Sequence, residues 1–246
     1  MNISTFELIV LIVVFLLTSV VGVVTGSNSL IAVPAMFQVG IDERVAIATN
    51  MFGLTFMAIG GTIPFLRQGK IEAGKLTPLI VLTLIGSALG ALLVGYITNQ
   101  SIKLIVSVSM FVVVVFSFVR TQPKEGSKIL WFGYIASFLL AIYGGLYSGG
   151  YVTILTAVFV AFLGMDYTQA VGSTKLVNVF SSGVATLVFM WQGLVDYTLG
   201  IILAVTMFVG AYIGAHYATK MNEIWLKRIF LGTVVILAAK TLYDYI

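Results

Sequence analysis

The chain of 246 residues has no cysteine and only one histidine. Without cysteine it forms no disulfide and performs no thiol chemistry. One histidine and no cysteine leave no cluster for a transition metal, so we expect no metal site. The sequence also lacks a phosphate-binding Gly-x-x-x-x-Gly-Lys-Ser/Thr loop and any pair of carboxylates that suggests hydrolysis. We therefore expect neither an enzyme nor a bound cofactor.

Charge is scarce as well. Only 9% of the residues are charged and 60% are hydrophobic, whereas a soluble domain carries about 25% charge. Several apolar runs reach the roughly 20 residues that cross a bilayer. These features predict an integral membrane protein embedded in the lipid bilayer. The modest net charge of +4 reflects loop charges that set orientation, so we expect no nucleic-acid partner.

The apolar segments form two sets of five. They cover residues 6–24, 29–39, 45–66, 76–98 and 102–119, then 130–147, 152–163, 168–190, 197–219 and 226–243. The second segment of each set is too short to cross a hydrocarbon core of about 30 Å as a helix, so we expect a half-helix or a re-entrant piece. The predicted fold is all-α, with about eight full spans in a single transmembrane domain, residues 1–246.

The two sets are related by a gap-free offset of 124 residues. This offset maps Gly26 to Gly150, Gly40 to Gly164, Asp42 to Asp166, Phe65 to Phe189, Gln68 to Gln192 and Gly69 to Gly193. We divide the chain into repeat 1 (1–121), a polar hinge (122–128) and repeat 2 (129–246). A duplicated, nearly all-apolar chain is typical of a secondary transporter, whose substrate site usually lies between the halves.

Equivalent loops of the two repeats carry opposite charge. The loop at 67–75 contains three basic residues, whereas its counterpart contains only Asp196; the loop after 76–98 has only Lys103, whereas its counterpart at 220–228 has three basic residues. By the positive-inside rule, equivalent loops then lie on opposite sides of the membrane, so the repeats are inverted. An odd number of segments per repeat requires the same inversion. The loops at 67–75, 120–128 and 220–228 are predicted to be cytoplasmic.

The first candidate substrate site is a pair of polar tips between the first and second segments of each repeat. The tips contain Thr25, Gly26, Ser27, Asn28 and Ser29 in repeat 1, and Tyr147, Ser148, Gly149 and Gly150 in repeat 2. A helix that begins after such a tip directs free N–H groups and the positive end of its dipole at the tip, which favours an anion. Alternatively, the glycines serve only tight helix packing.

The second candidate is the start of the third segment of each repeat. Hydroxyl and amide groups there could bind oxyanion oxygens: Thr49 and Asn50 in repeat 1, and Ser173, Thr174, Lys175 and Asn178 in repeat 2. Lys175 lies about seven residues inside its segment, and a lysine within a membrane segment is a functional hypothesis by default. The alternatives are that Lys175 snorkels to the surface or pairs with a carboxylate. Asp42 and Asp166 are expected to be helix N-caps.

The chain resembles the TauE/SafE sulfite exporter family. The family pattern is a glycine-rich tip, a proline, a glycine and then Ala-x-Gly-Thr-Ser, once in each half. The matching residues are Gly22, Gly26, Pro34, Gly40 and 46–50 in repeat 1, and Gly144, Gly145, Gly149, Gly150, Gly164 and 170–174 in repeat 2. The chain departs from the pattern in Ser27, Asn28 and Ser29, where glycine is more usual, and in lacking the second proline.

This resemblance implies transport of a small sulfur-containing anion, such as sulfite or an organosulfonate, across a bacterial inner membrane. Together with the repeats it predicts a secondary transporter, an exporter working by alternating access. Coupling to protons and downhill flux driven by the membrane potential both remain open, as does homo-oligomer formation. The alternatives are an anion channel and a non-transporting membrane scaffold.

Overall fold

Every regular element in the described part of the chain is a helix. The computed structural model describes residues 3–26, 28–69, 71, 73–118 and 130–217. The elements are α1 (Thr5–Thr25), α2 (Ser29–Gln38), α3 (Glu43–Arg67), the 3-10 helix η1 (Ala73–Leu76), α4 (Thr77–Val94), α5 (Asn99–Phe118), α6 (Leu130–Leu146), α7 (Tyr151–Leu163), α8 (Tyr167–Trp191) and α9 (Tyr197–Tyr217).

Five of these helices, α1, α3, α4, α8 and α9, are long and apolar enough to cross a membrane. The second apolar segment of each set is short, as expected: α2 has 10 residues and α7 has 13. Nine of the ten apolar segments thus appear as helices near their predicted positions. The hinge at 122–128 and the segment at 226–243 lie outside the described residues, and the total of about eight spans stays a prediction.

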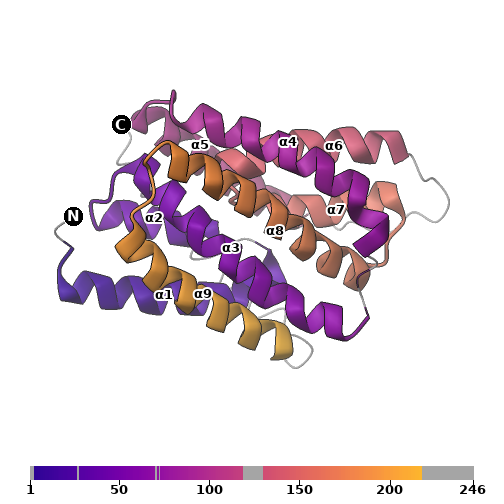
Figure 1. Cartoon of the computed structure of the whole chain (residues 1–246), viewed down its shortest axis with the longest axis horizontal. Helices are drawn as coiled ribbons and strands as arrows, with labels where there is room; N and C mark the ends of the chain where they lie inside the picture. The colour runs from indigo at the N-terminus through magenta and orange to yellow at the C-terminus, as the bar shows by residue number, and fades with distance from the viewer. Residues whose placement is uncertain (1–2, 27, 70, 72, 119–129, 218–246) are drawn as a thin grey trace.

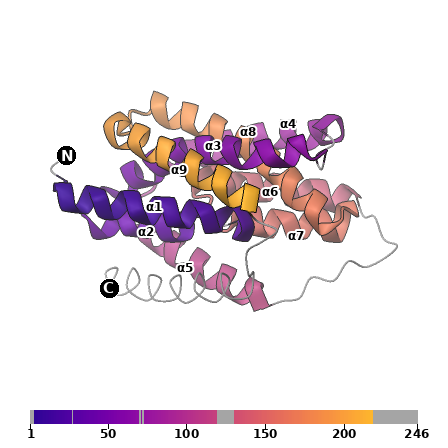
Figure 2. The same ribbon diagram turned by 90° about the horizontal axis from the view of Figure 1, so that it is seen from below.

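The long helices lie side by side along the long axis of the molecule (Figure 1). Helices α3 and α8 pack together at the centre, α9 and α1 continue the bundle on one side, and α4 and α6 continue it on the other. Figure 2 shows α2 and α7 on one face of this layer, with α5 beyond them. Helix α5 contacts both short helices. The short helices are therefore enclosed between α5 and the central pair.

Close helix contacts depend on glycine. A Cβ built on Gly86 would lie 2.9 Å from the carbonyl oxygen of Phe138 on α6, and one on Gly210 would lie 2.8 Å from that of Leu16 on α1. Lipid gives no hydrophobic drive for helices to associate, so close backbone approach at small residues provides much of the packing energy. The α4–α6 and α9–α1 pairs are the tightest of this kind.

The side chains are distributed as expected for a lipid solvent. Large apolar residues point outward on the long helices, including Leu17, Leu139, Leu187 and Val205, while hydroxyl and amide side chains are buried. The helix starts follow the sequence signals. Asp42 accepts hydrogen bonds from the backbone N–H groups of Arg44 and Val45, and Asp166 accepts one from Gln169, so both predicted N-caps are confirmed.

Candidate substrate site

The two polar tips meet inside the bundle. The Tyr147 hydroxyl donates to the carbonyl oxygen of Ser29 at 3.0 Å, and the Thr153 hydroxyl donates to that of Thr25 at 2.7 Å. These bonds join residues more than 100 positions apart in the chain. The tips of α1–α2 and α6–α7 therefore form one polar region between the two halves.

Each tip depends on unusual backbone geometry. Helix α1 ends at Gly26, with a φ of 81°, and α7 begins after Gly150, with a φ of 80°. Ser148 also has a positive φ, 68°, a conformation that costs a non-glycine residue roughly 1–2 kcal/mol. The Tyr143 hydroxyl donates to the carbonyl oxygen of Gly149 and holds this strained turn in place. Such strain is typical of functional turns.

A small cavity lies where the tips meet. Its lining comes from α1, α2, α3, α7, α8 and the second tip: Gly22, Val23, Gly26, Asn28, Ser29, Leu54, Met57, Ala58, Ser148, Val152, Lys175 and Asn178. All of these residues except Gly26 are buried. The space open to the centre of a water-sized sphere is about 10 Å³, room for roughly one water molecule. A sulfite-sized anion could enter only if the cavity widened.

Lys175 is the one cation among the residues that line this cavity. Its side chain is only 4% exposed, so it does not snorkel to the membrane surface. The ammonium group donates to the carbonyl oxygen of Gly22, 3.3 Å away in the last turn of α1. No carboxylate pairs with it in the part of the chain that the structure describes. Lys175 thus has a neutral partner at the negative end of a helix dipole.

Three buried asparagines surround the same region. Both side-chain polar atoms of Asn28 lack a hydrogen-bond partner among the described residues, as does Oδ1 of Asn178. Asn50 donates from Nδ2 to the Ser29 hydroxyl at 2.9 Å, and its own Oδ1 has no partner there. Buried polar groups are nearly always hydrogen-bonded in folded proteins, so these unpaired groups are available to bind a polar ligand or water.

The predicted residues that the structure describes fall into three groups: residues that line the cavity, residues that support the tips, and hydroxyl residues outside both. The cavity lining includes Gly26, Asn28, Ser29, Ser148, Lys175 and Asn178. Asn50, Tyr147, Gly149 and Gly150 support the tips without being part of the lining. Ser27 lies outside the described residues.

Four predicted hydroxyl residues lie elsewhere. The Thr49 hydroxyl accepts from the backbone N–H of Asp196, at 3.0 Å, in the loop before α9. The Thr174 hydroxyl lies 3.1 Å from that of Thr156 and donates to a backbone carbonyl of α8. The Thr25 hydroxyl donates to the backbone of its own helix, and Ser173 is buried outside the lining. These groups are used in packing rather than directed at the cavity.

The sequence analysis missed the Gly22 carbonyl and the apolar part of the lining. The repeat offset could have indicated two of these residues. Leu54 is the repeat partner of Asn178, and Val152 is that of Asn28, so both lining asparagines have an apolar counterpart in the lining. The sequence gives no comparable signal for Met57 and Ala58.

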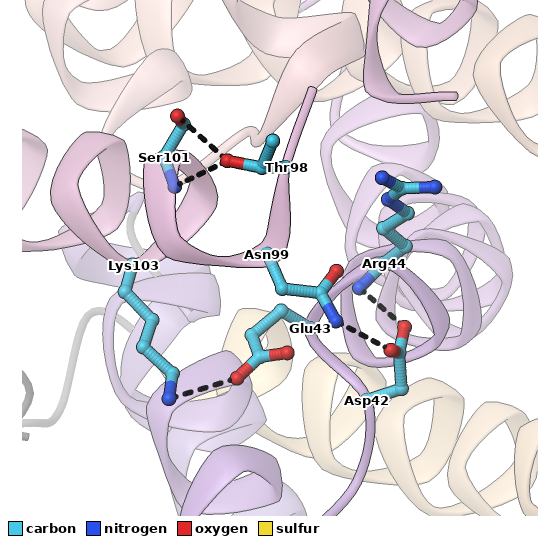
Figure 3. Close-up of polar contacts among 7 residues, drawn as sticks. All are labelled: Asp42, Glu43, Arg44, Thr98, Asn99, Ser101 and Lys103. Atoms are coloured by element: carbon cyan, nitrogen blue, oxygen red, sulfur yellow. Dashed lines mark hydrogen bonds and ion pairs between the residues drawn. The ribbon is translucent and has the colours of Figure 1, made fainter. Parts of the chain in front are cut away.

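A separate polar cluster lies where α3 and α5 begin (Figure 3). Lys103 forms an ion pair with Glu43 at 3.0 Å, and Asn99 donates to Asp42 at 2.6 Å. Lys103, which the charge pattern of the loops predicts to face outward, therefore has its partner in this cluster and not in the cavity. Because the ion pair is partly exposed, it contributes at most about 1 kcal/mol to stability.

A helical membrane bundle with a cationic, partly polar cavity between two broken-helix tips has the architecture of a membrane transporter. The chain matches the family model described as "Sulfite exporter TauE/SafE" over residues 11–241 and belongs to this family. It is a multi-pass protein of the bacterial inner membrane.

Its relatives are described in similar terms. The chain is 26% identical over 249 residues to "Probable membrane transporter protein YfcA" of Escherichia coli (strain K12), covering 98% of this chain and 92% of the relative. A "Probable membrane transporter protein" of Haemophilus influenzae is 23% identical, over 99% of this chain and 98% of the relative. "Probable membrane transporter protein YdhB" of Bacillus subtilis (strain 168) is 24% identical, over 93% of this chain and 97% of the relative. No solved structure matches the chain.

Proposed function

We propose that this protein exports small oxyanions, sulfite or organosulfonates, by alternating access between two inverted repeats. The observation that carries the proposal is the position of Lys175, a buried lysine with no anionic partner among the described residues, in the cavity where the two tips meet. A ligand with negative charge and several oxygen atoms would satisfy both Lys175 and the unpaired asparagine groups.

Backbone geometry supports the duplication. The described glycines with positive φ are Gly26, Gly40, Gly69, Gly150, Gly164 and Gly193, and they form three pairs separated by 124 residues. Helix α3 spans Glu43–Arg67, and α8 spans Tyr167–Trp191, the same length at the same offset. Both helices begin at an aspartate cap.

Helix direction supports the inversion. In Figure 1, α3 and α8 run in opposite directions along the bundle, as do α4 and α9. The packing is reciprocal as well, because α4 of one repeat packs on α6 of the other, while α9 packs on α1. This arrangement suits a carrier whose two halves rock about a shared central site.

In the proposed mechanism, the anion binds between Lys175, the amides of Asn28 and Asn178, and the N-terminal end of α2. The N-terminal end of the short helix α2 directs a partial positive charge toward this point. The present cavity has room for about one water molecule, so the structure corresponds to a closed form that widens to admit substrate. The lining holds no carboxylate and no histidine, and Lys175 is its one titratable side chain.

The test is the flux of radiolabelled sulfite and sulfoacetate into proteoliposomes. Wild-type protein should give saturable flux, and Lys175→Met should reduce it at least about tenfold, the effect of losing a charge-assisted hydrogen bond. Methionine occupies the repeat-equivalent position, Met51, so the variant should fold. Lys103→Met is the matched control, because it removes a lysine outside the cavity and should leave the flux near the wild-type value.

Other results would favour the alternatives. Non-saturable flux at channel rates, without exchange, would indicate an anion channel. Absence of flux for every oxyanion tested, at any imposed pH gradient or potential, would indicate a scaffold. Saturable flux that Lys175→Met leaves unchanged would retain the carrier but move its site away from this cavity.

A further inference from the structure

Lys175 has no counter-ion among the residues that the structure describes. The only contact of its ammonium group in the described structure is the neutral carbonyl oxygen of Gly22, although the group can donate three hydrogen bonds. An ammonium ion buried without an anion costs many kcal/mol. A positive charge that arrives together with an anion and leaves with it avoids this cost.

The acidic residues that the structure describes lie outside the cavity lining. Of the nine, those described lie at helix ends or in loops: Glu7, Asp42, Glu43, Asp166 and Asp196. The other four, Glu72, Glu125, Glu223 and Asp244, lie outside the predicted apolar segments. No acidic residue in the described part of the chain is therefore placed to neutralise Lys175.

The elements around Lys175 also offer few titratable groups. Helix α8 packs against α3, α4, α6, α7 and η1, and α1 and α2 share its cavity. Helix α3 has Glu43, Arg44 and Arg67, all at its ends, and α1 has Glu7 in its first turn; η1 has Lys75, and α2 and α4 have no charged residue. The remaining groups are tyrosines: Tyr134, Tyr143, Tyr147, Tyr151 and Tyr167. None of these supplies a permanent negative charge to the cavity.

From this geometry we propose that the site takes up one proton with each monoanion, with Lys175 as the proton carrier. The inference rests on the proposed function. The amine nitrogen of Lys175 accepts a proton as the anion arrives, and the resulting ammonium forms an ion pair with it. On release the proton leaves with the anion, so the amine returns to its contact with Gly22. No covalent bond to the anion forms or breaks.

The consequence is electroneutral transport. A monoanion and a proton carry no net charge across the membrane, so the membrane potential exerts no net force on the cycle. The anion gradient and the pH gradient alone set the direction, so export requires an outward anion gradient larger than the inward proton gradient. A simple anion uniporter differs sharply, since its equilibrium accumulation ratio changes about 50-fold per 100 mV, the equivalent of 2.3 kcal/mol per charge.

The experiment measures accumulation of methanesulfonate and isethionate, which remain monoanions from pH 5 to 9, in proteoliposomes containing a pH-sensitive dye. The potential is set with potassium and valinomycin. The expected accumulation ratio is independent of voltage and changes tenfold per unit of imposed pH difference, and an inward anion gradient should acidify the lumen.

A ratio that follows voltage without lumen acidification, or flux only in exchange for internal anion, would overturn the inference while preserving the carrier. Flux of neither sulfonate would contradict the proposed organosulfonate transport and this inference with it.

Lys175→Arg provides a second measurement, because an arginine keeps its proton. Any transport by this variant should become voltage-dependent and lose its proton flux. Lys103→Arg is the matched control and should behave as wild type. The wild-type voltage measurement decides the question even where Lys175→Arg is inactive.

Discussion

At the scale of single residues, the candidate site combines groups that do not stabilise the fold. Lys175 is buried against a neutral carbonyl, Ser148 has a positive φ, and Asn28 lacks side-chain partners in the described structure. Unsatisfied groups of this kind cost free energy and are retained where function requires them. Replacing such a group by an apolar residue should therefore reduce transport without reducing the stability of the fold.

Asn28→Leu is expected to keep or raise the thermal stability while reducing oxyanion flux at least about tenfold. The side chain is 3% exposed and makes no side-chain hydrogen bond among the described residues, so an apolar residue of similar volume removes a desolvation cost of about 1–3 kcal/mol. Thermal unfolding in detergent and proteoliposome flux measure the two effects. Asn50→Leu is the comparison for stability, because it loses the bond to Ser29 and should unfold at a lower temperature. Unchanged flux in Asn28→Leu would place the anion elsewhere.

Some of the residues chosen from the sequence line the cavity and others do not, and their binding of an anion stays a prediction. Lys175 and Asn178 could be predicted because polar groups within a membrane segment must face protein. Thr49 could not be assigned, since its position in α3 is equally compatible with the cavity and with its actual partner, the N–H of Asp196. The direction of a short hydroxyl side chain is set by which helix packs beside it, and that pairing is a tertiary property.

At the scale of helices, the tightest contacts depend on missing side chains. Both repeats use a pair of glycines four residues apart, Gly86 and Gly90 on α4, and Gly210 and Gly214 on α9. The sequence predicted the element lengths and their caps from hydropathy and turn residues. It did not predict that α4 packs on α6 and α9 on α1, because apolar helices offer many surfaces of similar composition.

Gly90→Ala and Gly214→Ala should each destabilise the protein by about 1–3 kcal/mol or more, the cost of overpacking. The added methyl groups would overlap the carbonyl oxygens of Ile142 and Val20 respectively. Gly183→Ala is the matched control on α8, because its nearest neighbour, a Thr55 methyl carbon, lies at 3.9 Å and alanine favours a helix. Thermal unfolding of the three variants in one detergent provides the measurement. Equal stability of Gly90→Ala and Gly183→Ala would contradict the close α4–α6 contact.

At the scale of the whole molecule, the account depends on a central cavity that opens in turn to each side of the membrane. The structure has this cavity closed around Lys175, with the two tips bonded to each other across it. Rocking of the halves would break such bonds and admit the anion. The 124-residue offset in the sequence predicted a site where the two tips meet, whereas the small size of the cavity could be seen only from side-chain packing.

The most direct test of this central claim uses the natural absence of cysteine. Ser148→Cys introduces a single thiol into the cavity lining, and Leu139→Cys places one on a side chain that is 59% exposed on the outer surface. A membrane-impermeant methanethiosulfonate that carries a sulfonate group is added from one side of the membrane at a time. The account predicts that Ser148→Cys reacts from either side, that transported anion protects it, and that Leu139→Cys remains unlabelled in lipid. Reaction of Ser148→Cys from one side only, or from neither, would contradict it.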